Sequence, residues 1–476
     1  MTSRICLLIV ALLLPQAAAL TPSEWAINTP DGGAPTFTAS GSVTHQAGAI
    51  LSLGVLKPAT PNSIVTISSR IPAETFRGRR VTIRGEMLTR GAGAASLWMR
   101  IDRQGGSLFL DNGLDRAVKG DSEWTPFATS LPVPASASIA IFGVILQGGG
   151  AVEVRALKFE IGAALTADAP VAPQAQAVLD AAIDLVKTKA LKRDALDWAT
   201  LGPELRALAG GAERSAEVYP AIRYLLAALG DRHSFLMPPA QTTAFRTGGA
   251  QNPRPEVRTL TGGIGYINVP AYGGADRAAA DSYTTFVHES IATTMPTAGC
   301  GWIVDLRANG GGNMWPMLAG LKPFLGDEPL GTFVGAGGVA GPAWKAGQGG
   351  GIEPPARLSA LTQAWVAVLT GPRTASSGEA VAIAFRGRPR ARSFGQPTAG
   401  LSSANETLPL PDGAMIALTT AIDADRTGRQ YGEKVDPDEL AGAAQATPPA
   451  APPAATLEEP ATAAAVAWLK KSCGAM

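Results

Sequence analysis

The chain has 476 residues, of which 46% are hydrophobic and 17% are charged, and its formal net charge at pH 7 is +1. This length predicts two or three domains, and the apolar fraction is enough for a sizeable core. A nearly neutral chain gives no electrostatic reason to expect nucleic acid or an anionic membrane as its partner.

Residues 1–19 have the order of a secretory signal peptide. Arg4 precedes the apolar stretch 5–14, which is too short to span a bilayer, and small residues follow up to Ala19. We therefore expect cleavage near Ala19 and a periplasmic or secreted mature protein. An oxidising compartment permits Cys300 and Cys473 to pair, although the sequence does not decide whether they do. Since neither has another cysteine or a histidine beside it, we expect no metal site.

Residues 20–162 have the pattern of a β domain. Gly, Pro, Asp and Asn turns separate segments that alternate or run apolar, among them 81–85, 96–102, 139–146 and 152–161. Strands at this spacing, without helices between them, predict an antiparallel β-sandwich. The segments 97–102 and 122–125 resemble strands of the galactose-binding-like jelly-roll modules. That resemblance implies a glycan ligand or a scaffold, and we favour the scaffold.

A linker and helices are expected next. Residues 163–176 are rich in alanine and proline, which is typical of a linker. A helical domain is expected over 177–245, because apolar residues recur there at helical spacing, as in Leu179, Ile183 and Val186. Residues 441–476 are expected to form a second Ala/Pro-rich linker and a C-terminal helix.

An α/β domain is expected over residues 256–440. Its two unbroken apolar runs, 302–306 and 364–369, are typical of buried parallel strands. A glycine-rich turn, 309–312, follows the first run, and the serine-containing segment 374–379 follows the second. Because the carboxyl ends of parallel strands meet at one edge of a sheet, the glycine amides and a serine hydroxyl should lie together. Amide donors and a hydroxyl are the minimum set for acyl transfer.

Five motifs occur in a fixed order: Leu-Gly-Asp231-Arg-His233-Ser, Gly263-Ile-Gly-Tyr-Ile-Asn-Val, Val304-Asp-Leu-Arg-Ala-Asn-Gly-Gly, Thr374-Ala-Ser-Ser-Gly-Glu and Leu410-Pro-Asp-Gly. This set resembles the S41 serine peptidases, which include the C-terminal processing peptidases. The resemblance implies a crotonase-like ββα core, a serine nucleophile and hydrolysis of peptide bonds. Processing peptidases usually insert a PDZ domain before the core, but the segment between Phe235 and Gly262 is too short for one.

The resemblance also implies site residues. The nucleophile of the family falls on Ser376, with Ser377 as its competitor. The N–H of Ser377 and that of Gly310 or Gly311 would form the oxyanion hole. The lysine that usually activates the serine falls on Leu401, which cannot exchange a proton, so a serine–lysine pair is excluded.

His233 is therefore expected to be the general base, as in the branch of the family that resembles the tricorn protease. In that branch an acid supports the histidine. We assign this role to Glu433, with Asp231 as a local alternative, although Glu433 is equally well explained as a surface residue without a role. Structural roles are expected for three further charged residues: an ion pair that holds the glycine loop for Asp305 and Arg307, and helix-start hydrogen bonds for Glu379.

We thus predict an exported serine-type endopeptidase that acts on peptides or unfolded proteins through an acyl-enzyme. It needs no metal or organic cofactor in this scheme, and the sequence leaves its oligomeric state open. Three alternatives use the same features: an esterase, a lipid carrier on the same fold, and a glycan-binding protein whose C-terminal half is scaffold. Labelling of Ser376 by a fluorophosphonate would separate an enzyme from a carrier.

Overall fold

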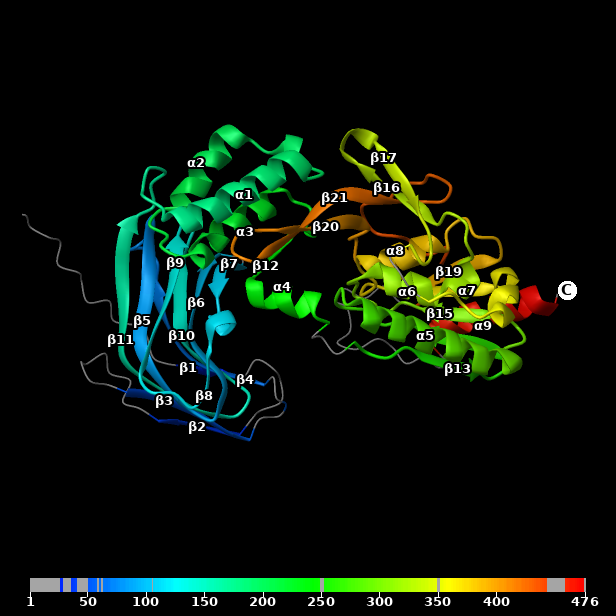
Figure 1. The fold of residues 1–476 in the computed structure, drawn as a ribbon, viewed down its shortest axis with the longest axis horizontal. Helices are drawn as coiled ribbons and strands as arrows, with labels where there is room; N and C mark the ends of the chain where they lie inside the picture. The colour runs from blue at the N-terminus through cyan, green and yellow to red at the C-terminus, as the bar shows by residue number, and fades with distance from the viewer. Residues whose placement is uncertain are drawn as a thin grey trace, which may run out of the picture. The chain divides into compact units, whose positions relative to one another are not determined.

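The computed structural model describes residues 26–28, 36–40, 50–57, 60, 63–104, 106–248, 252–348, 352–442 and 459–474 (Figure 1). The expected signal peptide and most of the expected linker after residue 441 lie outside these ranges. The chain forms two compact units, one of Met1–Gln176 with Gly202–Ala221 and one of Ala177–Leu201 with Ile222–Met476. Within the described ranges, no helix is long and apolar enough to cross a membrane.

The first unit contains two antiparallel sheets. One has the order β1 (Ala26–Asn28), β4 (Ile64–Pro72), β10 (Ile139–Gln147), β6 (Ala92–Arg103) and β7 (Gly106–Asp111), and β8 (Val118–Gly120) also pairs with β6. The other has the order β2 (Thr36–Ser40), β3 (Ile50–Lys57), β11 (Gly150–Ala164), β5 (Arg79–Arg90) and β9 (Thr125–Val133). These strands include all four segments named from the sequence, so the prediction of antiparallel β structure agrees with the structure.

Side chains from the two sheets meet in one core. The Phe142 ring on β10 lies 5.2 Å from the Phe159 ring on β11, and the Thr129 hydroxyl donates to the Leu97 carbonyl across the layers. The guanidinium of Arg80 donates to the carbonyls of Leu208 and Gly210. Those carbonyls lie at a helix end, where backbone acceptors have no partner within the helix.

The helices expected as a separate domain over 177–245 are instead shared between the two units. They are α1 (Pro173–Lys189), η2 (Arg193–Ala195), α2 (Trp198–Ala209), η3 (Ser215–Val218), α3 (Tyr219–Ala228) and α4 (Pro239–Arg246). Residues Gly202–Ala221 group with the first unit and the flanking segments group with the second. The helical segment therefore does not form one compact unit by itself.

The second unit is built on a sheet that is parallel except for its first strand. The order is β13 (Glu256–Leu260), β14 (Ile264–Asn268), β15 (Trp302–Asp305), β18 (Val366–Thr370), β19 (Ala391–Gly395) and β22 (Glu439–Leu440). The apolar runs 302–306 and 364–369 supply β15 and β18, which are adjacent in this sheet. Every residue of these two strands is buried, as expected for strands covered on both faces.

Helices cover both faces of this sheet. The core on one face includes residues of α5 (Arg277–Thr294), α6 (Met314–Gly320), α7 (Lys322–Leu325) and α8 (Ser377–Ala384). The core on the other face joins strand residues such as Ile303 and Leu369 to Ala465 and Leu469 of α9 (Pro460–Gly474). The helix α9 lies in the segment 441–476, where a C-terminal helix was expected from the sequence.

A second sheet in this unit carries the segment after α3. Its order is β12 (Phe235–Met237), β21 (Met415–Asp425), β16 (Gly331–Gly335) and β17 (Ala340–Trp344), and β20 (Ser403–Pro409) also pairs with β21. The short elements η4 (Met295–Thr297), η5 (Ala336–Gly338) and η6 (Ala356–Gln363) complete the unit. Between β12 and β14, the described residues form only α4 and β13. This is the segment that was expected to be too short for a PDZ domain.

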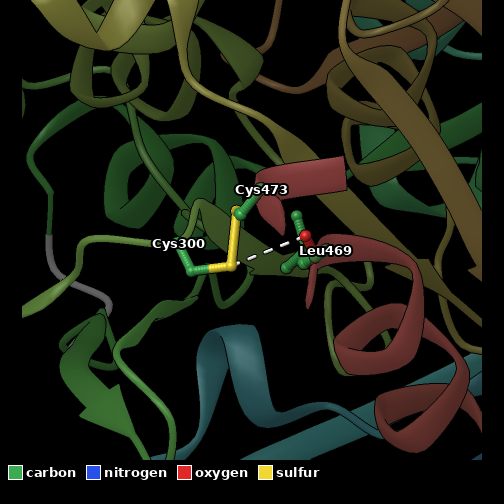
Figure 2. The surroundings of a disulfide bond; sticks show 3 residues. All are labelled: Cys300, Leu469 and Cys473. Carbon is green, nitrogen blue, oxygen red and sulfur yellow. Dashed lines mark hydrogen bonds between the residues drawn. A yellow bond between two sulfur atoms is a disulfide. The ribbon is translucent and has the colours of Figure 1, made fainter. Parts of the chain in front are cut away.

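The structure joins Cys300 and Cys473 in a disulfide with a Cα–Cα distance of 5.6 Å (Figure 2). Cys300 lies just before β15, and Cys473 lies in the last turn of α9. The Cys300 sulfur also lies 3.5 Å from the carbonyl oxygen of Leu469. The bond therefore fastens the helix to the sheet face that it covers, and it answers the question that the sequence left open.

We expect reduction of this disulfide to lower the stability of the second unit. The bond closes a loop with a sequence separation of 173 residues, and loss of such a bond typically costs about 2–5 kcal/mol. The check is thermal unfolding with and without dithiothreitol, with free thiols counted to verify reduction. In the double variant Cys300→Ser/Cys473→Ser, the melting temperature should already be low and should not respond to the reductant. An unchanged melting temperature in fully reduced wild type would contradict the prediction.

Candidate active site

Ser376 lies on a strained turn between β18 and α8. Its backbone has φ 51° and ψ −122°, a conformation that L-residues other than glycine rarely adopt and that costs about 1–3 kcal/mol. Gly311 packs directly against it, and a Cβ added at Gly311 would lie 2.8 Å from the Ser376 Cβ. The glycine loop is therefore needed for this close approach, and the strain presents the serine side chain at the carboxyl edge of the sheet.

The structure brings His233 to this serine. The His233 Nε2 lies 2.9 Å from the Ser376 Oγ, although the two residues are 143 positions apart in the chain. His233 is 8% exposed, and the residue before it, Arg232, is another non-glycine residue with a positive φ, 58°. Backbone strain thus occurs on both sides of the contact, which is common where surrounding structure enforces a functional geometry.

The other ring nitrogen of His233 faces a residue that the sequence argument missed. Nδ1 lies 2.8 Å from the Oγ of Ser403, on β20. Asn405, two residues further along the same strand, donates from its side chain to the His233 carbonyl. One strand therefore holds both the ring and the backbone of the histidine. The signal available in the sequence was a pair of serines directly after Leu401, at the position of the absent lysine.

Burial lowers the pKa of His233 below its usual value of 6.5, and the nearby charge of Asp231 opposes this shift. The imidazole is therefore largely neutral at pH 7, with one ring nitrogen free to accept a proton. Asp231 does not contact the ring. Its carboxylate accepts from the backbone N–H groups of His233 and Ser234, each at 2.9 Å, and from the Ser234 hydroxyl. The hydrogen bonds of Asp231 thus order the turn, and the Nδ1 of the imidazole pairs with Ser403.

The carboxylate of Glu379 links the serine turn to the loop before β20. It accepts from the Ser376 N–H at 2.8 Å, as expected for a glutamate at a helix start, and also from the N–H groups of Gly400 and Leu401 and the Thr398 hydroxyl. Burial raises the pKa of Glu379, while these hydrogen bonds lower it in part. One buried carboxylate thus fixes the backbone of Ser376 and the loop that leads to Ser403.

The expected oxyanion-hole donors differ in their surroundings. The Gly311 N–H, one of the expected donors, donates to the Asn309 side-chain oxygen at 3.0 Å and is therefore engaged in this structure. Gly310 is exposed, and Ser377 is the first residue of α8, where backbone N–H groups lack helical acceptors. The Ser377 hydroxyl donates to the Gly312 carbonyl at 2.7 Å and does not face His233. The amides of Gly310 and Ser377 are therefore the remaining candidates.

Glu433 is not brought to the histidine. Its side chain is exposed, and its carbonyl oxygen accepts a hydrogen bond from the Ser402 hydroxyl. The Nδ1 of His233 is bonded to Ser403, so the assignment of Glu433 as the acid that orients the ring is corrected. The expectation rested on distance from a downstream motif, which does not fix where a loop side chain points.

The glycine loop has a buried ionic support. The Asp305 carboxylate, at the end of β15, accepts from Arg307 Nε at 2.9 Å and Nη2 at 2.6 Å, and from the Tyr266 hydroxyl at 2.9 Å. Arg307 is 5% exposed. Because an unpaired charge would be costly at this depth, the pair holds the chain in one path as it leaves the strand. This is the ion pair expected from the sequence.

An imidazole, an alcohol and nearby backbone amides are the groups that acyl transfer requires. In the described part of the chain, no group of three or more His, Cys, Asp or Glu residues could hold a metal ion. Residues 263–441 match the model of peptidase family S41.

Similar proteins extend this match. The Nisin-resistance protein of Lactococcus lactis subsp. lactis is 29% identical over 265 residues, which cover 55% of this chain and 81% of that protein. An uncharacterized HTH-type transcriptional regulator of Bacillus subtilis (strain 168), YbfP, is 32% identical over 97 residues, 20% of this chain and 33% of that protein. A solved lipoprotein structure from Streptococcus agalactiae shares the fold with a TM-score of 0.51 and 24% identity, covering 64% of this chain and 98% of that one.

We expect Glu379→Gln to destabilise the second unit by about 1–3 kcal/mol, because an amide group would face backbone donors that now share two carboxylate oxygens. Chemical denaturation of both proteins measures the difference. Glu433→Gln is the matched control: its side chain is exposed, and its unfolding free energy should stay within about 0.5 kcal/mol of wild type. Equal stability of the two variants would show that the Glu379 contacts contribute nothing.

Proposed function

We propose that this protein is an exported serine-type endopeptidase in which Ser376 is the nucleophile and His233 the general base. The observation that carries the proposal is the 2.9 Å contact between His233 Nε2 and Ser376 Oγ on a strained strand-to-helix turn. A hydroxyl is a weak nucleophile at neutral pH unless an adjacent base removes its proton. The depressed pKa of His233 keeps that base unprotonated.

The reaction would proceed through an acyl-enzyme. His233 Nε2 takes the proton as Ser376 Oγ attacks the peptide carbonyl, and the negative charge develops on the carbonyl oxygen. The N–H groups of Gly310 and Ser377 stabilise that oxyanion, and one such donor is typically worth about 3 kcal/mol. His233 then gives its proton to the leaving amine. Water, deprotonated by the same imidazole, hydrolyses the ester and restores the serine.

Ser403 would complete the group as an orienting residue. If Nδ1–H donates to the Ser403 Oγ, then Nε2 carries the lone pair that the mechanism requires. The family's usual lysine position is occupied by Leu401, whose backbone N–H bonds to Glu379. A serine–histidine pair supported by a second serine thus replaces the serine–lysine pair.

The substrate class we propose is a peptide or unfolded polypeptide in the periplasm or outside the cell. Residues 1–19 support export through their signal-peptide pattern. The Nisin-resistance protein among the relatives makes nisin a sensible first peptide to test beside casein. For the N-terminal unit we propose a jelly-roll-like sandwich that acts as a scaffold, and for the second unit a crotonase-like core.

We expect Ser376→Ala and His233→Ala each to lower cleavage of denatured casein and nisin by about 10⁴-fold or more, because each removes a reacting group. Ser377→Ala should lose about tenfold at most, since its backbone N–H remains. A fluorophosphonate probe should label wild type and Ser377→Ala but not Ser376→Ala. Full activity in Ser376→Ala with loss of activity in Ser377→Ala would show that Ser377, and not Ser376, is the nucleophile. Folded wild type that takes no label would favour a lipid carrier, and cleavage of esters alone would favour an esterase.

The pH dependence of kcat/KM should report the histidine. Protonated His233 cannot accept a proton, so activity should fall as pH drops through its pKa, which lies below 6.5. Asp231→Asn removes the charge that raises this pKa and should move the acid limb to lower pH in whatever activity remains. An acid limb that stays in place in Asp231→Asn, or that moves to higher pH, would contradict the assignment of His233 as the titrating base.

A further inference from the structure

We propose that Glu459, at the start of the C-terminal helix α9, is a positioning residue that acts through Arg307 on the glycine loop beside Ser376. The inference rests on the proposed function, since it assigns to Glu459 the task of holding the backbone that supplies an oxyanion amide. Glu459 lies far from the serine in sequence and belongs to none of the five motifs that define the site.

Glu459 forms the second half of the ionic support of Arg307. The Glu459 Oε2 lies 2.6 Å from Arg307 Nη1, in a geometry that makes the contact an ion pair and not a linear hydrogen bond. The side chains are 15% and 5% exposed. Arg307 uses its other nitrogens for Asp305, so its guanidinium is clamped between a strand end and a helix start. A buried cation with only one of these partners would be less well compensated and freer to move.

The same carboxylate also begins α9. Its oxygens accept from the Thr462 N–H at 2.8 Å, the Thr462 hydroxyl at 2.7 Å and the Ala461 N–H at 3.2 Å. Burial raises the pKa of Glu459, but the Thr462 hydrogen bonds and the charge of Arg307 bring it below its usual value. The carboxylate is therefore ionised at neutral pH, and its position is fixed by the helix.

Contacts lead from Arg307 to the reacting serine in a few steps. Two residues after Arg307, the Asn309 side chain accepts from the Gly311 N–H, and the Asn309 carbonyl accepts from the Ala375 N–H at 2.9 Å. Gly311 in turn packs against Ser376, and the Asn309 carbonyl lies so close to Gly378 that a Cβ there would approach it to 2.5 Å. Because the glycine loop and the serine turn are in close contact, a shift of the backbone at Arg307 displaces the glycine loop relative to Ser376.

The helix is anchored at both ends of one strand. The strand β15 begins after Cys300, which is bonded to Cys473 near the end of α9 (Figure 2). It leads into Arg307, which is paired with Glu459 just before the start of α9. The apolar face of α9, with Ala465 and Leu469 buried, packs between these two anchors. Glu459 is thereby held by a rigid element and can hold Arg307 in turn.

The test compares Glu459→Gln with wild type. Glutamine keeps an oxygen for the Thr462 N–H but removes the charge that pairs with Arg307. We expect kcat to fall about tenfold to a hundredfold with KM within about twofold, because a loop displacement of this kind weakens stabilisation of the transition state and not substrate binding. Glu459→Asp, which keeps the charge, should recover part of the loss. Amide hydrogen exchange in residues 308–312 should be faster in Glu459→Gln.

Glu439→Gln is the matched control, since Glu439 pairs with Arg392 at 3.2 Å in the same unit and is half exposed; its kcat should stay at the wild-type value. Three results would overturn the proposal. The first is hydrogen exchange in residues 308–312 that is unchanged in Glu459→Gln. The second is a lower melting temperature of Glu459→Gln with an unchanged kcat, and the third is an equal loss of kcat in the control Glu439→Gln. The exchange result does not depend on catalysis, so it separates this proposal from the proposed function, which fails when wild type neither cleaves peptides nor takes the fluorophosphonate.

Discussion

The geometry of the site depends on one buried carboxylate. Glu379 accepts hydrogen bonds from the backbone of Ser376 and from the loop that leads to Ser403, so it joins the chain segment of the alcohol to the chain segment that orients the imidazole. The positive φ of Ser376 is maintained because this carboxylate and the neighbouring glycine loop leave the turn little alternative. Strain of this kind persists only where the surroundings over-determine it.

The carboxyl edge of the parallel sheet explains why distant segments meet. β15 and β18 are adjacent and parallel, so the glycine loop after one lies beside the serine turn after the other. The histidine arrives from outside this sheet, on the turn before β12, and is held there by β20 and by the Asp231 carboxylate. The site therefore combines two strand ends of one sheet with a turn carried by another, all within the second unit.

The sequence was informative where a pattern is local. Unbroken apolar runs identified β15 and β18, and helical spacing identified α1, because these patterns follow directly from burial. The approach of His233 to Ser376 was anticipated through motif order and the leucine at position 401. Ser403 could not be found this way, because its role comes from the pairing of β20 with β21, which no local pattern encodes. The expected partners of Glu433 and of the Gly311 N–H differ from those in the structure for a related reason: hydrogen-bond partners depend on where loop side chains point. The grouping of the helices with two different units was also beyond local pattern.

The placement of α9 has a consequence for how the second unit is assembled. All the strands of its central sheet precede α9 in the chain, yet one apolar face, with Ile264, Ile303 and Phe394 among its members, is covered by that helix. A growing chain in which every strand has already been synthesised still exposes this apolar face to solvent until α9 packs against it. Ser376 and His233 are thus synthesised well before the unit that carries them is able to close, so their contact forms late in assembly.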